Sequence, residues 1–153
     1  MPKVTIIPTE YDHLLPVAKD MREADVLEVS ATGNLPYESL TEGFNLSSRC
    51  WTGLVDNRPA AIFGVAPMSV LGGVGSPWLL GTNDTMKVKR EFLLSAGQYV
   101  EQMLSLYPTL INYVDARNTA SIRWLKWLGF EMQEPIPFGL SGELFHPFEM
   151  RAQ

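Results

Sequence analysis

The sequence predicts an α+β domain, in which a central mixed, mostly antiparallel sheet is flanked by helices. Three observations lead to this prediction. Patterned segments follow one another as strand, helices, three strands, long helix, strand, helix and two strands. A turn-forming cluster at 56–59 joins two apolar β-rich runs as a hairpin. The segment 109–130 has the pattern of a buried strand followed by a helix that begins after Asn118 and ends at Gly129.

Each element has its own local signal. β-rich or apolar runs predict strands at 3–8, 50–55, 60–68, 76–82, 109–116, 130–135 and 142–151. Helical patterns predict helices at 11–21, 22–33, 34–49, 83–108 and 117–130. Gly33 is a candidate C-cap of the second helix, and Pro36 marks the start of the third. The long helix at 83–108 has an apolar residue every three or four positions and stops at Pro108.

The composition fits a single globular domain that covers 1–153. Of the 153 residues, 46% are hydrophobic and 19% are charged, which are ordinary values for a chain with a packed core. The single cysteine, Cys50, excludes an intramolecular disulfide, fits a reducing compartment and is expected to be a small buried hydrophobe. His13 and His146 have no cysteine, histidine or acid at metal-ligand spacing, so no metal site is expected.

Charge is unevenly distributed along the chain. The formal net charge is −5, so non-specific affinity for nucleic acid is not expected. Residues 87–126, however, hold six basic residues against three acids, which leaves this segment at +3 and the remainder at −8. An anionic small ligand could bind here, or the charges could belong to a solvated helix face.

The closing segment carries a motif of a known enzyme superfamily. The motif is an asparagine, a small residue three positions later, an apolar residue at six, and Gly-Phe at eleven and twelve. Here these positions are Asn118, Ser121, Trp124, Gly129 and Phe130. Together with the hairpin "GLVDNRPAAIFGVAP" and the element order, this motif resembles the GNAT superfamily of acyl-coenzyme A N-acyltransferases. The resemblance covers nearly the whole chain and implies the GNAT fold.

A second resemblance is narrower. The stretch "LINYVDARNTASIRWLKWLGF", followed by a short strand and "GELFHPFEM", looks like the GNAT-like internal virion proteins of short-tailed bacteriophages. In those proteins an Asn-Tyr-Val strand leads into an Asn-Thr-Ser-x-Ile-Arg-x-Leu helix. The resemblance implies a phage origin, with a virion or DNA-ejection role for some relatives and an acetyltransferase activity for others. The expected location is the cytoplasm of the host cell, with packaging in the virion as the alternative.

The GNAT resemblance implies an acetyl-coenzyme A site in the opening between the strands at 76–82 and 109–116. There the pyrophosphate would meet backbone N–H groups at a helix start, where unpaired donors and the helix dipole favour an anion. Asn118 would face a ligand amide while capping the last helix, although capping alone would explain it. The residues assigned to the coenzyme site are Trp78, Leu79, Leu80, Gly81, Thr82, Lys87, Lys89, Arg90, Asn118 and Ser121.

Two features depart from the GNAT pattern. The family's glycine-rich loop is "GTNDTMKVKR" here, in which Gly81 comes too early and Asp84 lies near the expected phosphate. We expect Asp84 to cap the following helix, where its carboxylate would compete for the same N–H groups. Many members protonate the leaving thiolate with a tyrosine seven residues after the asparagine, and that position is Leu125. Tyr99 and Tyr113 are the nearest substitutes, and both are expected in the core.

A general base is expected among the acids of the second helix. Asp25 and Glu28 lie three residues apart on one helical face, so both carboxylates could meet an amine at the cleft edge. They are the candidate catalytic residues, and a solvated acidic face would explain them equally well.

Three functions remain open from the sequence. The first, which it narrowly favours, is an N-acetyltransferase that moves an acetyl group from acetyl-coenzyme A to a primary amine of a small molecule or protein. The second is a catalytically silent GNAT-like internal virion or DNA-ejection protein. The third is a binding protein that modulates a host partner. Neither a specific nucleic-acid partner nor a membrane span is expected, because no run approaches the roughly 20 apolar residues that a span needs.

Overall fold

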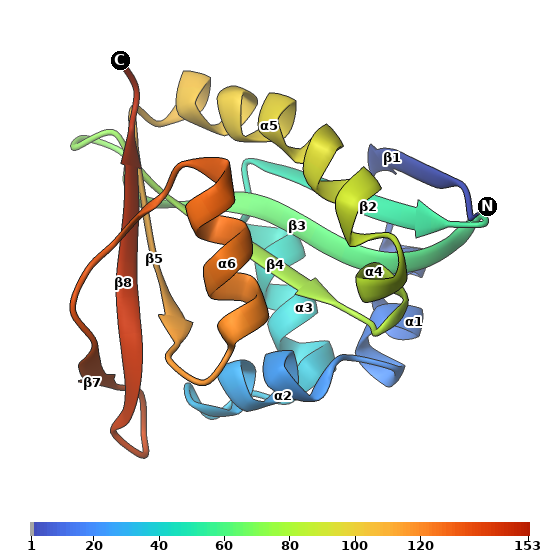
Figure 1. Cartoon of the computed structure of the whole chain (residues 1–153), viewed down its shortest axis with the longest axis horizontal. Coiled ribbons are helices and arrows are strands. Elements are labelled where there is room, and N and C mark those ends of the chain that lie inside the picture. The colour runs from blue at the N-terminus through green and yellow to red at the C-terminus, as the bar shows by residue number, and fades with distance from the viewer. Residues whose placement is uncertain (1) are drawn as a thin grey trace.

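The computed structural model describes residues 2–153 and contains the α+β architecture that the sequence predicts (Figure 1). The strands form one sheet in the order β1-β2-β3-β4-β5-β8-β6, and β7 pairs with β8. All pairs are antiparallel except β4 with β5. The strands are β1 (Val4–Pro8), β2 (Arg49–Val55), β3 (Arg58–Ser69), β4 (Val74–Gly81), β5 (Thr109–Asp115), β6 (Glu131–Met132), β7 (Ile136–Phe138) and β8 (Glu143–Arg151).

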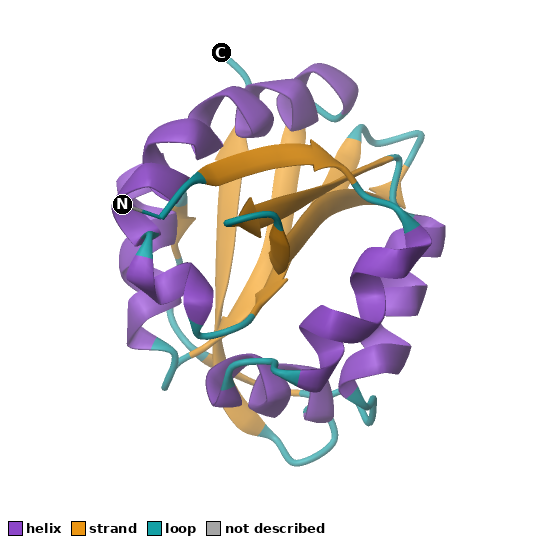
Figure 2. Cartoon of the chain, turned by 90° about the vertical axis from the view of Figure 1, so that its right-hand side faces the viewer, coloured by secondary structure: helices purple, strands orange, loops and turns teal. Residues whose placement is uncertain are grey.

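Helices cover both faces of the sheet (Figure 2). They are η1 (Tyr11–His13), α1 (Leu14–Lys19), α2 (Glu23–Ser30), α3 (Pro36–Leu46), α4 (Asp84–Lys87), α5 (Lys89–Leu106) and α6 (Thr119–Leu128). Neighbouring residues of β3 point to opposite faces, as the strand period requires. Ile62 packs with the core residues of α1, α2 and α3, whereas Phe63 packs with those of α5 and α6. The domain therefore has two main apolar cores, one on each face, and a smaller buried cluster of Val55, Ala60 and Val88.

Local signals in the sequence account for the hairpin and the closing helix. Asp56 and Asn57 both have positive φ, at 50° and 65°, which is the backbone that a two-residue hairpin turn requires. The Asn118 side chain accepts the Ser121 N–H at 3.3 Å and so caps α6. Gly129 ends that helix in the left-handed region, with φ of 106°. The predictions for these residues are confirmed.

The predicted helix at 83–108 is two helices, because the backbone breaks at Val88. The Val88 side chain is buried against β2 and β3 with Val55 and Ala60, and this tertiary contact overrides the helical pattern. The prediction that Asp84 caps the helix is wrong. Asn83 occupies the N-cap position, and the Asp84 carboxylate instead pairs with Lys87 at 3.1 Å in the first turn.

Two smaller differences concern segments around the sheet edge. The C-cap of α2 is Ala31, while Gly33 takes its positive φ of 84° two residues later. The connection between the last two predicted strands contains the short strand β7, which the sequence pattern did not predict. Because β7 places Phe138 against Tyr113, with ring centroids 4.4 Å apart, it adds one wall to the site described below.

Two glycine-to-alanine substitutions should have opposite effects on stability. A Cβ on Gly64 would lie 2.5 Å from the Arg49 carbonyl oxygen, whereas a Cβ on Gly97 of α5 meets nothing within 4 Å. Gly64→Ala is expected to lower the free energy of unfolding by at least about 2 kcal/mol, because strand backbone must move apart. Gly97→Ala should raise it by up to about 1 kcal/mol through helix propensity. Urea denaturation measures both, and equal effects would contradict the packing described at Gly64.

Candidate functional site

The site begins where β4 and β5 separate. The two strands pair in parallel only at Val74 with Thr109 and Gly75 with Leu110. Two residues further along β4, Pro77 has no N–H to continue the ladder. Its carbonyl oxygen accepts a hydrogen bond from the Asn112 side-chain amide at 2.6 Å in place of a backbone donor. The strands diverge beyond this point and leave a fork in the sheet (Figure 1).

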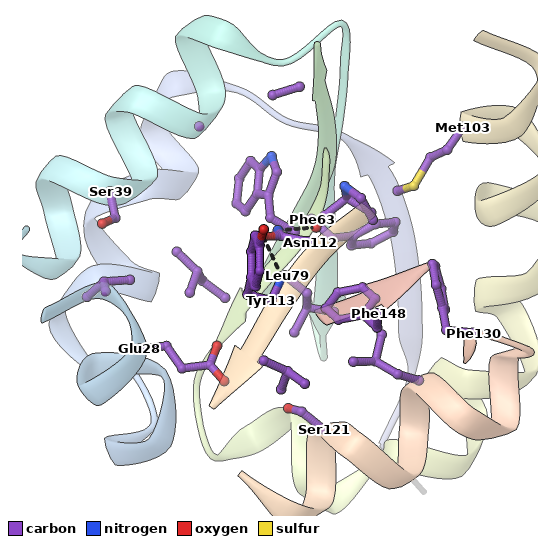
Figure 3. Close-up of a pocket in the computed structure, with 18 of the residues that line it drawn as sticks. Glu28, Ser39, Phe63, Leu79, Met103, Asn112, Tyr113, Ser121, Phe130 and Phe148 are labelled. Atoms are coloured by element: carbon purple, nitrogen blue, oxygen red, sulfur yellow. Dashed lines mark hydrogen bonds between the residues drawn. The ribbon is translucent and has the colours of Figure 1, made fainter. Parts of the chain in front are cut away.

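A cavity of about 430 Å³ fills the fork and is lined from both helical layers. Its walls are mainly aromatic and aliphatic. The polar groups come chiefly from α2, α3 and α6, and Figure 3 shows the Glu28 carboxylate and the Ser121 hydroxyl on the cavity side of their helices. The larger lining side chains are Phe63, Trp78, Leu79, Phe92, Tyr99, Met103, Tyr113, Phe130, Phe138 and Phe148.

Glu28 connects α2 to β5, one of the two strands that form the fork. One carboxylate oxygen accepts the Asp115 backbone N–H at 3.1 Å and the Asn118 side-chain amide at 3.0 Å. Burial raises the pKa of Glu28 to about 7, with a smaller upward contribution from the Asp25 charge, although the Asn118 and Asp115 donors act in the opposite direction. A carboxyl group with this pKa can both accept and release a proton near neutral pH.

Asp25 connects α2 to β4, the other strand of the fork. Its carboxylate accepts the Gly81 N–H at 2.9 Å, and its other oxygen lies 3.6 Å from the Arg22 guanidinium. Burial raises the pKa of Asp25, while Arg22 and the Gly81 donor lower it. The backbone N–H of Arg22 donates to the Gly81 carbonyl oxygen at 2.8 Å. Next to it, Met21 forms an isolated antiparallel bridge with Thr82. The start of α2 therefore covers the end of β4 as an extra strand would.

The two candidate catalytic residues, Asp25 and Glu28, thus lie one turn apart on α2 but have different surroundings. Glu28 lines the cavity, whereas Asp25 is 1% exposed and lies outside the cavity lining, bonded to Gly81 and paired with Arg22. Only Glu28 has access to a molecule in the fork. Their roles in catalysis stay predictions.

The residues predicted to bind a coenzyme divide into three groups. Trp78, Leu79, Leu80 and Ser121 line the cavity. Asn118 is 4% exposed, and both ends of its amide are bonded within the chain, to Ser121 and Glu28. The others lie around the end of β4 and the start of α5, away from the cavity lining, and are Gly81, Thr82, Lys87, Lys89 and Arg90.

Around the end of β4 most polar groups already have partners. The Thr82 and Thr85 hydroxyls both donate to the Ala60 carbonyl at 3.0 Å. Lys87 pairs with Asp84, while Lys89 and Arg90 lie exposed in the first turn of α5. These cations oppose the helix dipole, so an anion near this turn would be favoured by charge.

Leu125 occupies the position at which many GNAT enzymes carry a tyrosine. The Leu125 side chain lines the cavity and packs against the α5–α6 core. Tyr99 is part of an aromatic cluster with Trp51 and Phe63, at centroid distances of 5.0 and 5.5 Å. Tyr113 stacks on Phe138. Both tyrosines line the cavity as well as the core, which goes beyond the sequence expectation of core residues alone.

Sequence reasoning missed the residues that shape the opening. Asn112, which bonds to Pro77, and the α3 residues Ser39 and Glu42 all line the cavity. A proline inside a central strand was a usable signal for the fork, because it removes a donor from the ladder. Nothing local identifies Ser39 or Glu42, since they reach the cavity only through the packing of α3.

Two further findings bear on the chemistry of the described residues. Across residues 2–153, no group of three or more histidine, cysteine, aspartate and glutamate side chains is arranged to hold a metal ion. None of the helices in the same residues is long and apolar enough to cross a membrane.

Comparison with solved structures identifies the fold. A GNAT superfamily phosphinothricin acetyltransferase from Sinorhizobium meliloti, in complex with AcCoA, superposes with a TM-score of 0.77 at 12% identity, over 97% of this chain and 88% of that chain. The ribosomal-protein-S5-alanine acetyltransferase of Vibrio fischeri gives a TM-score of 0.69 at 10% identity, over 100% and 97%. At such identities the likeness concerns the fold alone, and the chain has the GNAT fold.

Sequence comparison gives a narrower relationship. The family model described as "Bacteriophage T7, probable scaffold protein Gp13" matches residues 62–135, which include the fork and the closing helix. The probable scaffold protein gp13 of Escherichia phage T7 is 32% identical over 115 residues, covering 72% of this chain and 73% of that protein. The chain therefore belongs to the family of the bacteriophage T7 probable scaffold protein Gp13.

Proposed function

We propose that this chain is a phage assembly protein in which the GNAT fold serves as a structural module. The relationship to the T7 protein carries the proposal, because that relative is named a probable scaffold protein and shares 32% of residues over 115 positions. The cleft supports it, since the polar groups at the end of β4 bind other parts of the same chain.

The contacts at the end of β4 favour this proposal over acetyl-coenzyme A binding. A pantetheine arm in the fork would pair with the backbone of the β4 edge that faces β5. At Gly81 both backbone groups on that edge are taken, the N–H by Asp25 at 2.9 Å and the carbonyl by the Arg22 N–H at 2.8 Å. Binding would have to displace the start of α2 and expose a buried ion pair, which is costly.

Removing the gene from the phage that encodes this chain is expected to lower the yield of complete infectious particles. Wild-type protein supplied in trans should restore the yield, and so should Glu28→Gln, because the proposal requires the fold and not the chemistry of the cleft. Gly64→Ala, which disturbs the sheet, should restore less. Infectious titre and mass spectrometry of purified particles measure the effect. Normal titre and particle composition without the chain would contradict an assembly function.

A second candidate, acetyl transfer, is favoured by the cavity and by Glu28. Acetyl-coenzyme A would supply an activated acetyl group. Glu28 lines the cavity with a pKa of about 7, so its carboxylate could take the proton that an attacking amine loses. No described tyrosine occupies the position of Leu125, which leaves the thiolate without the usual acid.

Calorimetric titration of the purified protein with acetyl-coenzyme A separates the two candidates. From the contacts at Gly81 we expect no measurable heat and no thermal stabilisation at millimolar coenzyme. The double variant Lys87→Glu, Lys89→Glu tests whether any binding depends on the positive charge near the expected phosphate, because it reverses both charges. Micromolar binding of the coenzyme to the wild type, weakened in this variant, would contradict the expectation. It would support the acetyltransferase hypothesis, and a screen of amine acceptors would then follow.

The raised pKa of Glu28 makes a further prediction about stability. Between pH 4.5 and about 7 the unfolded chain releases a proton that folded Glu28 keeps, so the free energy of unfolding falls as pH rises. The fall is on the order of 3 kcal/mol for this group. Glu28→Gln should lack this component, and the difference between the two proteins isolates it from Asp25. Urea denaturation across this range and carbon-detected NMR titration of Glu28 provide the measurement, and titration near 4.5 would refute the desolvation described.

A further inference from the structure

We propose that this protein associates head to tail with further copies of itself through two oppositely charged helical layers. The layers lie on opposite faces of the sheet, with α1 and α3 on one face and α5 and α6 on the other (Figure 2). The proposal rests on the assembly function above and deepens it, because it names a second copy of the chain as the partner.

The first layer, residues 10–46, is acidic at its surface. Its exposed charged side chains are six acids and one lysine, while Arg22, Asp25 and His13 are buried. Two of the six acids flank α1, with Asp12 before it and Asp20 just after it. The exposed acids are Glu10, Asp12, Asp20, Glu23, Glu38 and Glu42, of which Glu42 also lines the cavity.

The second layer, made by α5 and α6, is basic on balance. Its exposed charged side chains are four cations and one acid, Glu101. The cations lie in the first turn of α5, at Lys89 and Arg90, and on α6, at Arg123 and Lys126. Within residues 2–153 none of these four cations forms an ion pair, in contrast to Lys87 and Arg117, which have carboxylate partners. Four unpaired cations on a chain with a net charge of −5 are suited to a negatively charged surface.

Each layer also has large exposed aromatic or aliphatic side chains, of the kind that anchor protein interfaces. Trp127, 59% exposed, lies beside Lys126 on α6. On the acidic layer Tyr11 is 59% exposed and Leu15 is 62% exposed, and the Tyr11 hydroxyl is held by that of Tyr37 at 2.9 Å. Exposed tryptophan and tyrosine are the side chains that dominate the energy of protein interfaces, while complementary charge sets orientation and encounter rate.

The charge pattern selects the geometry of association. A two-fold pair through a single layer would bring like charges together, which is unfavourable. Contact between the basic layer of one copy and the acidic layer of the next joins opposite charges, and it leaves one free layer at each end. Such a heterologous contact can repeat, so the expected products are chains or rings of increasing size.

Association is measured by sedimentation velocity of the purified protein at several concentrations. At about 0.01 M salt, where the Debye length is about 30 Å, the average mass should rise with concentration, and at about 1 M salt, where it is about 3 Å, the protein should be monomeric. A monomer at every concentration in low salt would overturn the proposal.

Two variants test the two layers separately. Lys89→Glu with Arg123→Glu reverses two charges of the basic layer, and Asp12→Lys with Asp20→Lys reverses two of the acidic layer. Each variant alone should stay monomeric in low salt. Their mixture should form a one-to-one complex that grows no further, because each partner keeps one intact layer. Circular dichroism checks that both are folded.

Glu131→Lys with Glu134→Lys is the matched control. It changes the net charge by the same amount as the acidic-layer variant but lies outside both layers, so it should associate like the wild type. Loss of association in only one of the two layer variants would contradict a head-to-tail contact and indicate a two-fold one.

Two other outcomes would also overturn the proposal. A failure of the mixed variants to combine would show that the layers do not meet each other. Salt-sensitive binding of a DNA oligonucleotide that the basic-layer variant loses, without self-association, would assign the basic layer to nucleic acid. These measurements use purified protein, whereas the assembly function is scored by particle yield, so either can fail while the other holds.

Discussion

The separation of β4 from β5 after two paired residues decides where the other features of the molecule can lie. Pro77 has no N–H for the ladder, and Asn112 turns its side-chain amide to the Pro77 carbonyl, so the strands cannot close beyond this point. The open edge of β4 and the end of β5 then require other partners, because buried backbone groups must be hydrogen-bonded. In this chain α2 supplies them. The fork is therefore both the origin of the cavity and the reason for the position of α2.

Two carboxylates of α2 connect it to the two arms of the fork. Asp25 accepts the Gly81 N–H of β4, and Glu28 accepts the Asp115 N–H of β5 and the Asn118 amide. Both have raised pKa values because desolvation outweighs their hydrogen bonds. A perturbed carboxyl group in a cleft often indicates catalysis, but structural networks perturb pKa values in the same way. Here each acid satisfies backbone or amide donors of the chain itself, and this accounts for both residues without a substrate.

The parts of the fold that the sequence predicted are those with local causes. The hairpin turn, the Asn118 cap and the Gly129 stop depend on residues within a few positions of each other, and all were read correctly. The break at Val88 depends instead on burial against β2 and β3, which no helical pattern reports. The site divides in the same way. The cavity-lining positions of β4 and α6 followed from the GNAT resemblance, whereas the bond from Glu28 to Asn118 joins residues 90 apart.

The cavity of about 430 Å³ does not by itself require that the protein bind a ligand there. Its walls belong to the two main apolar cores, and Pro77 lacks the N–H that would help β4 and β5 to pair across it. The chain keeps the GNAT fold at 10–12% identity to the two acetyltransferases, and in this chain the fold includes an opening in the sheet. Function can then move to surfaces that the cores do not constrain. The charged helical layers are such surfaces, because their exposed residues can change sign without disturbing either core.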